Sequence, residues 1–316
     1  MGAPVSRALR VPSFAKINLG LEVLHRRRDG YHELRTVFQT IDLHDDIVLR
    51  ECPRGVVLRC AHPEVPEDRT NLAARAAQAL RRHAGIGSGV LIEIEKRVPV
   101  ARGLGGGSSN AAAVLLGLDR LWGLGLGPAG LQPLARRLGA DVPFFLLGGT
   151  ALGLARGDEV YPLRRQVRAH VVVVDPGRPI STPAVYARLA GRLTPSENSH
   201  RIYRFVSSDL GGLDGVQLLA NDLERAALEE APGLARPARR IRKVLVGEGA
   251  RLVLLSGSGS AWFGIFDSPG PARGACAALA AAGFRTHRAR TLSRDQYRGI
   301  WARSLESARP GQGQTR

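Results

Sequence analysis

The residues with the clearest chemical potential stand in the stretch 99–113, which reads PVARGLGGGSSNAAA. Its three consecutive glycines, 105–107, carry no side chains, so a ligand can approach the backbone closely. The serines and alanines that follow predict a helix, and the free N–H groups and positive dipole of a helix N-terminus suit a phosphate. Ser108 and Ser109 add hydroxyls for phosphate oxygens or a metal-bound water. The sequence therefore predicts a phosphate-binding turn, with a glycine-rich packing turn as the alternative.

This turn lacks the features of the most common phosphate-binding loops. It does not end in the G-K-[ST] of a Walker A loop, and it does not satisfy G-x-G-x-x-G. The chain also contains neither the H-R-D nor the D-F-G motif of protein kinases. We therefore expect a phosphate site of a less common kind.

Lysine is rare in this chain, which makes each lysine a candidate for a chemical role. Among 45 Lys and Arg residues, only Lys16, Lys96 and Lys243 are lysines. Where arginine supplies nearly all the positive charge, a remaining lysine can be one that the chemistry requires. Chance retention is the alternative, and the sequence alone favours neither.

Patterns of apolar residues predict the elements that carry these candidates. Residues 11–24 alternate, which predicts a half-buried strand with Lys16, Asn18 and Glu22 on its polar face. Further strands are predicted at 47–51, 56–60, 90–94, 149–154, 171–175, 252–255, 262–266 and 286–291. Helices are predicted at 71–83, after the glycine turn, at 128–138, after 141, at 216–229, at 235–246 and in the alanine-rich stretch between the strands 262–266 and 286–291.

Length and composition indicate a folded protein of two domains. The chain has 316 residues, of which 44% are hydrophobic and 23% charged, so global disorder is excluded. We expect an N-terminal domain at 1–160, a C-terminal domain at 161–306 and a disordered tail at 307–316. The polar segment 194–215 is expected to be an insertion or a mobile loop. The longest mostly apolar run is too short to span a bilayer and no leader is visible, which favours a cytoplasmic protein.

Charge and cysteine content limit the classes of partner. The formal net charge of +17 could attract nucleic acid or an anionic small molecule, or it could reflect an arginine-rich genome. The arginines are scattered and no nucleic-acid module is recognisable, so we expect neither a nucleic-acid nor a membrane partner. Cys52, Cys60 and Cys276 form no CxxC pair, which favours reduced thiols over disulfides or a zinc site.

Several motifs together resemble a known enzyme family. The glycine stretch is similar to the ATP loop of the galactokinase, homoserine kinase, mevalonate kinase and phosphomevalonate kinase (GHMP) superfamily. Within it, the chain resembles the family of 4-diphosphocytidyl-2-C-methyl-D-erythritol kinases in five further motifs, namely AKINL (15–19), DGYHEL (29–34), GADVPFF (139–145), NDLE (221–224) and LSGSG (255–259). The resemblance covers roughly residues 11–291. It implies an α+β, two-domain small-molecule kinase fold with the active site in the interdomain cleft.

The resemblance also implies an activity and a catalytic pair. The family phosphorylates the 2-hydroxyl of a cytidine-diphosphate-linked methylerythritol with ATP and Mg²⁺, in the non-mevalonate route to isoprenoids. Lys16 and Asp141 would be the catalytic pair. An aspartate can take the proton of the acceptor hydroxyl, while a nearby ammonium keeps it ionised and offsets charge on the transferred group. The alternatives are a solvated strand lysine at 16 and a helix N-cap at 141.

Binding residues carry over by the same motifs. The implied ATP-binding residues are Lys96, Pro99, Gly103, Leu104, Gly105, Gly106, Gly107, Ser108 and Ser109, with Asn71 near the nucleotide. The implied substrate-binding residues are Asn18, Tyr31, His32, Thr182, Pro183 and Tyr186. Tyr31 would stack on cytosine, and Tyr186 would form a second wall of that site. The alternatives are that Tyr31 lies in an ordinary surface loop and that Tyr186 is a core aromatic. The metal ligands and the oligomeric state remain open.

Two rival functions compete with this prediction. Another kinase of the superfamily could act on homoserine or mevalonate, but the Tyr31–His32 pair and the motif STPAVY (181–186) argue against it. A basic RNA-binding protein could use the same kind of domain without catalysis, but the intact Lys16, Asp141 and glycine turn argue against that.

Overall fold

The computed structural model describes residues 8–189, 200–208 and 212–306, and its elements form an α+β architecture. The strands are β1 (Ala8–Arg26), β2 (His32–Cys52), β3 (Val56–Arg59), β4 (Gly89–Glu95), β5 (Thr150–Leu154), β6 (Glu159–Pro162), β7 (His170–Asp175), β8 (Leu252–Leu255), β9 (Trp262–Phe266) and β10 (Arg285–Arg290). The α-helices are α1 (Leu72–Ala84), α2 (Gly106–Leu121), α3 (Gly127–Leu138), α4 (Val142–Leu147), α5 (Thr182–Arg188), α6 (Arg201–Ser207), α7 (Leu223–Glu230), α8 (Ala235–Gly247), α9 (Pro269–Ala281) and α10 (Arg294–Glu306).

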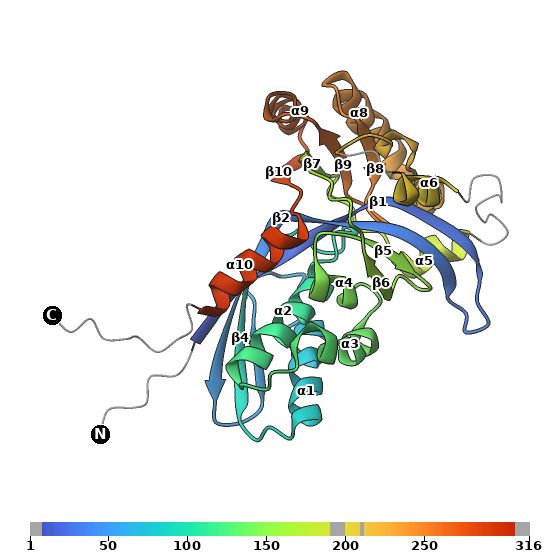
Figure 1. Cartoon of the computed structure of the whole chain (residues 1–316). Helices are drawn as coiled ribbons and strands as arrows, with labels where there is room; N and C mark the ends of the chain where they lie inside the picture. Colours follow the sequence, from blue (N-terminus) through green and yellow to red (C-terminus); the bar gives the residue numbers. More distant parts are fainter. Residues whose placement is uncertain (1–7, 190–199, 209–211, 307–316) are drawn as a thin grey trace.

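A long antiparallel hairpin of β1 and β2 organises the molecule (Figure 1). It belongs to a six-stranded sheet in the order β3-β4-β2-β5-β6, with β1 paired to β2. A second, four-stranded antiparallel sheet has the order β10-β7-β9-β8. Figure 1 shows the hairpin crossing the molecule between α1–α4 on one side and the second sheet on the other. The hairpin therefore meets both halves of the chain.

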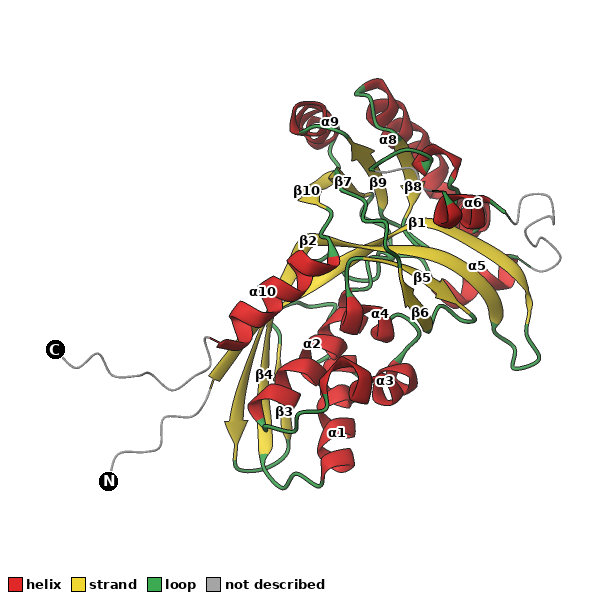
Figure 2. Cartoon of the chain, in the orientation of Figure 1, coloured by secondary structure: helices red, strands yellow, loops and turns green. Residues whose placement is uncertain are grey.

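Three clusters of buried apolar side chains lie between these layers. The first joins the large sheet to α1–α4 and α10, the second joins the hairpin to the four-stranded sheet, and the third lies between that sheet and α7, α8 and α9. Figure 2 shows the corresponding sequence of helix and sheet layers. Since α10 packs in the first cluster, this late helix returns to the N-terminal half of the chain. The domain boundary at 160/161 stays a prediction.

The structure corrects the expectation of a half-buried first strand. Both faces of β1 are covered, so Lys16, Asn18 and Glu22 are only 3%, 2% and 0% exposed. The polar face does not meet solvent because other segments of the chain pack on it. The alternative that Lys16 is a solvated strand lysine is therefore wrong.

Most predicted elements are present, and the differences have physical causes. Strand β2 begins at His32 although the sequence predicted only 47–51, because residues 36–41 are all buried, so both faces are covered and no alternation is present. The helix predicted at 216–229 is broken into a 3-10 turn, Val216–Leu218, and α7. Helix α10 was missed. Part of segment 194–215 forms α6, while its residues 194–199 and 209–211, like the tail 307–316, lie outside the described residues.

Two expectations about class can be compared with the fold. None of the helices in the described part of the chain combines the length and apolar character needed to cross a bilayer. Cys52, Cys60 and Cys276 are all unpaired, as predicted for reduced thiols.

Candidate active site

A cleft of about 930 Å³ brings together side chains from distant parts of the chain, from Lys16 to Ser258. Its size lies in the range of pockets that bind small molecules, roughly 300–1,000 Å³. The residues predicted for a site that line it are Lys16, Asn18, Tyr31, His32, Gly103, Gly105, Ser108, Asp141, Thr182, Pro183 and Tyr186. The cleft thus collects the predicted catalytic pair, part of the glycine turn and all six predicted substrate residues.

Lys16 and Asp141 face each other in this cleft. Lys16 Nζ lies 3.4 Å from Asp141 Oδ2 and donates a hydrogen bond to Asn18 Oδ1 at 2.6 Å. It also lies 5.6 Å from the ring centroid of Phe38, a distance at which a cation is attracted to the ring face. A buried ammonium needs such partners because desolvation of an unpaired charge is costly. The arrangement holds a positive charge next to a carboxylate.

Irregularities in the hairpin direct Lys16 and Asn18 into the cleft. The register of β1 on β2 shifts between Phe14 and Lys16 and again between Asn18 and Gly20, and bulges of this kind re-aim side chains. The Lys16 backbone N–H leaves the strand ladder and donates to Leu104 O at 3.0 Å. The strand is therefore bonded directly to the glycine turn.

Asp141 occupies the N-cap position of α4 but does not cap it. In the described structure its carboxylate makes no capping hydrogen bond to that helix. The side chain is 32% exposed and is directed at the cleft, where Lys16 is its ion-pair partner. The carboxylate thus has free acceptor capacity on the side of the cleft.

At Gly103 and Gly105 the glycine turn approaches its neighbours too closely for a side chain. Gly103 and Gly105 have φ of +76° and +70°, in the left-handed region that favours glycine. A Cβ at Gly103 would lie 1.9 Å from Ser256 O, and one at Gly105 would lie 2.8 Å from Phe145 Cζ. Helix α2 follows with Gly105 as its N-cap, and no side chain from the described residues caps it there. The first amides of α2 are left for a ligand.

A second small-residue loop, residues 256–260, closes against the first. Ser256 Oγ donates to Gly103 O at 2.9 Å. The Asn221 side chain fixes this loop, because its amide donates to Leu255 O at 2.8 Å and to Gly257 O at 2.7 Å. The helix predicted at 216–229 is interrupted here because the backbone pairs with β1, where Leu21 N donates to Ala220 O at 2.9 Å and Asp222 N donates to Leu21 O at 3.0 Å.

Aromatic rings line the far part of the cleft. The rings of His32 and Tyr186 are stacked, with centroids 5.2 Å apart and planes at 30°. Tyr31 is 58% exposed, and the Arg156 guanidinium lies 5.1 Å from its ring centroid. Burial, aided by the charge of Arg26, lowers the pKa of His32 and so favours the neutral ring. Burial and the nearby charge of Asp141 raise the pKa of Tyr186 well above its usual range.

Other predicted ATP residues lie beside the cleft rather than on its surface. The Leu104 side chain is buried in the core, and Ser109 Oγ accepts a hydrogen bond from Ser13 Oγ at 2.8 Å. Asn71 caps α1 by accepting from Ala73 N at 2.9 Å. In the structure as described, these side chains therefore have structural partners, and an ATP-binding role for them stays a prediction.

The remaining four predicted ATP residues, Lys96, Pro99, Gly106 and Gly107, are not among the residues that line the cleft. A Cβ at Gly106 would lie 3.1 Å from Lys96 Nζ, and one at Gly107 would lie 3.8 Å from Leu72 Cδ1, next to the α1 cap. Pro99 is half-buried at the start of the turn. Lys96 Nζ itself donates to the buried Asp45 at 2.5 Å.

Sequence reasoning missed several residues of the cleft. Arg26 and Arg156 add positive charge near the aromatic rings, and Gly257 and Ser258 line the opposite side. Ser258 Oγ lies 2.6 Å from Thr182 Oγ1. The loop 256–260 carried a signal in its small residues, whereas the arginines were indistinguishable from the many others in the chain.

The chain is similar to proteins of known family. The model for the GHMP kinases N terminal domain matches residues 71–149. A 4-diphosphocytidyl-2-C-methyl-D-erythritol kinase from Gloeobacter violaceus is 42% identical over 281 residues, which cover 87% of this chain and 91% of that protein.

Two solved structures have a similar fold. A crystal structure of 4-(cytidine 5'-diphospho)-2C-methyl-D-erythritol kinase matches with a TM-score of 0.70 at 37% identity, covering 90% of this chain and 99% of that one. The homoserine kinase from Cytophaga hutchinsonii matches with a TM-score of 0.72 at 18% identity, covering 93% and 97%. The second likeness is one of fold alone.

Proposed function

The chain belongs to the 4-diphosphocytidyl-2-C-methyl-D-erythritol kinase family of the GHMP kinases, and on this basis we propose that it phosphorylates the 2-hydroxyl of 4-diphosphocytidyl-2-C-methyl-D-erythritol. It is an ATP-dependent small-molecule kinase. Its product would enter the non-mevalonate route to isoprenoid precursors.

One observation carries this proposal. The ion pair of Lys16 and Asp141, with its 3.4 Å separation, lines the same cleft as Gly105 and Ser108 of the glycine turn and as the aromatic rings. Phosphoryl transfer needs the acceptor hydroxyl and the nucleotide phosphates to meet in one place, with positive charge beside them. This cleft supports all three requirements.

The catalytic roles follow from the chemistry of the two side chains. Asp141 accepts the proton of the substrate hydroxyl as the new P–O bond forms, because its carboxylate is not engaged in capping α4. Lys16 keeps Asp141 ionised and offsets the charge that develops on the transferred group. Asn18 fixes the ammonium of Lys16 in place and is itself held, since its amide donates to Thr36 Oγ1 at 2.7 Å.

The nucleotide would lie along the glycine turn. The amides at the start of α2 and the hydroxyl of Ser108 would donate to the phosphates, and the left-handed φ of Gly103 and Gly105 keeps the turn free of side chains. Leu104 would contribute its backbone alone. Gly106 and Gly107 provide amides of the first helical turn.

The donor groups of the cleft are compatible with Mg²⁺ carried by the nucleotide. Magnesium is usually held by one or two carboxylates together with substrate phosphates and waters. Asp141 and the Ser108 hydroxyl are oxygen donors that line the cleft, and no cluster of three His, Cys, Asp or Glu side chains occurs among the described residues. Bound Mg²⁺ would neutralise phosphate charge.

The aromatic part of the cleft would hold the cytidine end of the substrate. Stacking on an aromatic side chain is worth about 1–3 kcal/mol per base. Tyr31 offers an exposed ring, and the stacked His32 and Tyr186 form a second wall. Arg26 and Arg156 would attract the diphosphate. Thr182 and Pro183, at the first turn of α5, complete that side.

An ATP-consumption assay with three acceptors tests the proposal. The purified chain is offered the cytidine-diphospho substrate, homoserine or mevalonate at equal concentration, and the phosphorylated product is identified by ³¹P NMR. We expect turnover with the cytidine substrate to exceed the other two by at least about 100-fold, since only it fills the aromatic wall. Equal or faster turnover of homoserine or mevalonate would refute the assignment.

A further inference from the structure

A buried aspartate that the mechanism does not use lies beneath the glycine turn. Asp45, on β2, is fully buried. Its Oδ1 accepts the backbone N–H groups of Arg97 and Val98, both at 2.8 Å, and its Oδ2 accepts Lys96 Nζ at 2.5 Å and Asn110 Nδ2 at 3.0 Å. Four donors from two other segments thus converge on one carboxylate.

These donors come from the two segments on either side of the glycine turn, where we propose that the nucleotide binds. Lys96, Arg97 and Val98 follow β4 and lead into the turn, while Asn110 lies in α2, just past the amides that would bind phosphate. A carboxylate is the one common acceptor that can take four hydrogen bonds at once. Asp45 therefore ties the entry of the turn to the helix at its exit.

The network continues through hydroxyls to the start of α2. Asn110 Nδ2 also donates to Ser13 Oγ at 2.9 Å, and Ser13 Oγ donates to Ser109 Oγ at 2.8 Å. Ser13, Ser109 and Asn110 are all buried. A buried polar network of this kind, when every member is satisfied, fixes the relative position of its elements.

The ammonium of Lys96 is held close to the turn by the same carboxylate. The Lys96 side chain is 5% exposed, and a Cβ at Gly106 would lie 3.1 Å from its Nζ and 3.2 Å from Val98 Cγ1. Asp45 is the carboxylate that pairs with Lys96 among the described residues, so without it the side chain would have to move toward solvent. Such a movement would shift the wall against which Gly106 packs.

We infer that Asp45 is a positioning residue of the nucleotide site, which holds Lys96 and the first turns of α2 in the geometry that binds the phosphates of ATP. This inference rests on the proposed function only in taking the glycine turn as the ATP site. Asp45 is fully buried and is not among the residues that line the cleft. Its loss should therefore weaken ATP binding and leave the binding of the cytidine substrate nearly unchanged.

An isosteric exchange of two side chains tests the inference. Asp45→Asn removes the charge and turns an amide toward Lys96 and Asn110, so donors face donors. Asn110→Asp alone places two carboxylates 3.0 Å apart. The double variant Asp45→Asn/Asn110→Asp returns one carboxylate and one amide to the same pair of positions. Asp46→Asn, which alters a neighbour paired at the surface with Arg10 and Arg97, is the matched control.

The readouts are the Kd of ATP by calorimetry, the KM of each substrate, kcat and the melting temperature. We expect each single variant to weaken ATP binding at least tenfold while the KM of the cytidine substrate changes less than threefold. The double variant should bind ATP at least tenfold more tightly than Asp45→Asn. The Kd of ATP for the control should stay within twofold of that of the unaltered protein. If Asp45→Asn alone fails to fold, the folded double variant still decides, since it should bind ATP within about threefold of the unaltered protein.

Three results would overturn the inference. ATP affinity could be unchanged in a folded Asp45→Asn variant, both substrates could lose affinity equally, or the double variant could regain its melting temperature without regaining ATP affinity. The Kd of ATP is measured without an acceptor, so it judges Asp45 separately from the proposed reaction. Failure of the unaltered protein to phosphorylate the cytidine substrate would count against the proposed function alone.

Discussion

Replacement of Asp141 by asparagine should abolish most of the chemical step while leaving the protein folded. The substitution preserves the shape of the side chain, but an amide cannot take the proton of the acceptor hydroxyl. Because the carboxylate does not cap α4, the helix loses no hydrogen bond. The partner ammonium of Lys16 keeps its hydrogen bond to Asn18.

The expected loss of rate is much larger than the expected loss of stability. A positioned general base contributes about 10²–10⁴-fold to rate, or about 2.7–5.5 kcal/mol of activation free energy. The Lys16–Asp141 pair has one partner 32% exposed, so its contribution to stability is discounted for solvent and should be about 0–1 kcal/mol. For a chain of this size, that corresponds to a change of melting temperature of at most about 4 °C.

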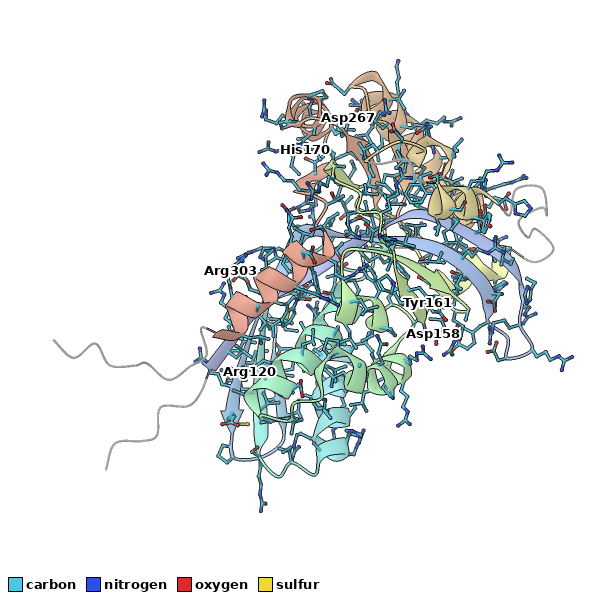
Figure 3. All side chains as sticks on the ribbon, in the orientation of Figure 1. Arg120, Asp158, Tyr161, His170, Asp267 and Arg303 are labelled. Atoms are coloured by element: carbon cyan, nitrogen blue, oxygen red, sulfur yellow. The ribbon has the colours of Figure 1, made fainter. Side chains whose placement is uncertain are left out.

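Steady-state kinetics and thermal unfolding together check this prediction. We expect kcat to fall by 10²–10⁴-fold, with the KM of ATP changed less than about threefold. Asp267→Asn is a suitable control, because Asp267 is exposed, lies 3.7 Å from Arg251 and stands at the end of the second sheet beside α9 (Figure 3). A kcat within tenfold of the unaltered protein would refute the role of Asp141 as base.

Four other perturbations have directions that the structure predicts. Gly106→Val should raise the KM of ATP at least tenfold and cost about 1–3 kcal/mol of stability, because a Cβ there already lies 3.1 and 3.2 Å from neighbouring side chains; an unchanged KM would contradict the position of the turn. Tyr31→Ala should raise the KM of the cytidine substrate about tenfold or more and spare that of ATP, whereas equal losses would speak against stacking. Arg102→Met should lower the free energy of unfolding by about 3–5 kcal/mol in urea titrations. Arg102 Nε donates at 2.7 Å to the buried Asp175, whose charge would remain unpaired in the variant. A loss below about 1 kcal/mol would show that the pair is dispensable. Burial raises the pKa of Glu22 in the folded protein, so the protein loses stability as pH rises from the pKa of the unfolded chain through that of the folded protein. The melting temperature of Glu22→Gln relative to the unaltered protein should therefore be higher at pH 7 than at pH 4. A difference that does not depend on pH would contradict this.

Local chemistry made some features predictable from the sequence. The glycine turn and the start of α2 follow from residues adjacent in the chain, since glycine freedom and helix-start signals act over a few positions. Helices α1 and α3 and the short strands β7, β8 and β9 were predicted from local residue patterns for the same reason. Helix α10 also carried a signal that was overlooked, because Tyr297, Ile300, Trp301 and Leu305 are spaced as one apolar helix face.

Other features depend on contacts that periodicity does not report. Residues 36–41 of β2 are buried on both faces, so they lack the alternation that marks a strand exposed on one side. The break in the helix predicted at 216–229 arises because backbone groups of Ala220 and Asp222 hydrogen-bond to Leu21 of β1, which is distant in the chain. Neither effect can be read from a window of neighbouring residues.

By itself, the sequence determined which residue types were available for phosphate chemistry and which local elements carry them. The tertiary structure decided that the polar face of β1 is buried, that Lys16 meets Asp141, and that Asp45 receives Lys96 and Asn110. The physical reason is that burial and ion pairing are set by whichever segments pack together, and those segments are distant in the chain. The hairpin of β1 and β2 makes these meetings possible because it contacts both halves of the molecule (Figure 1).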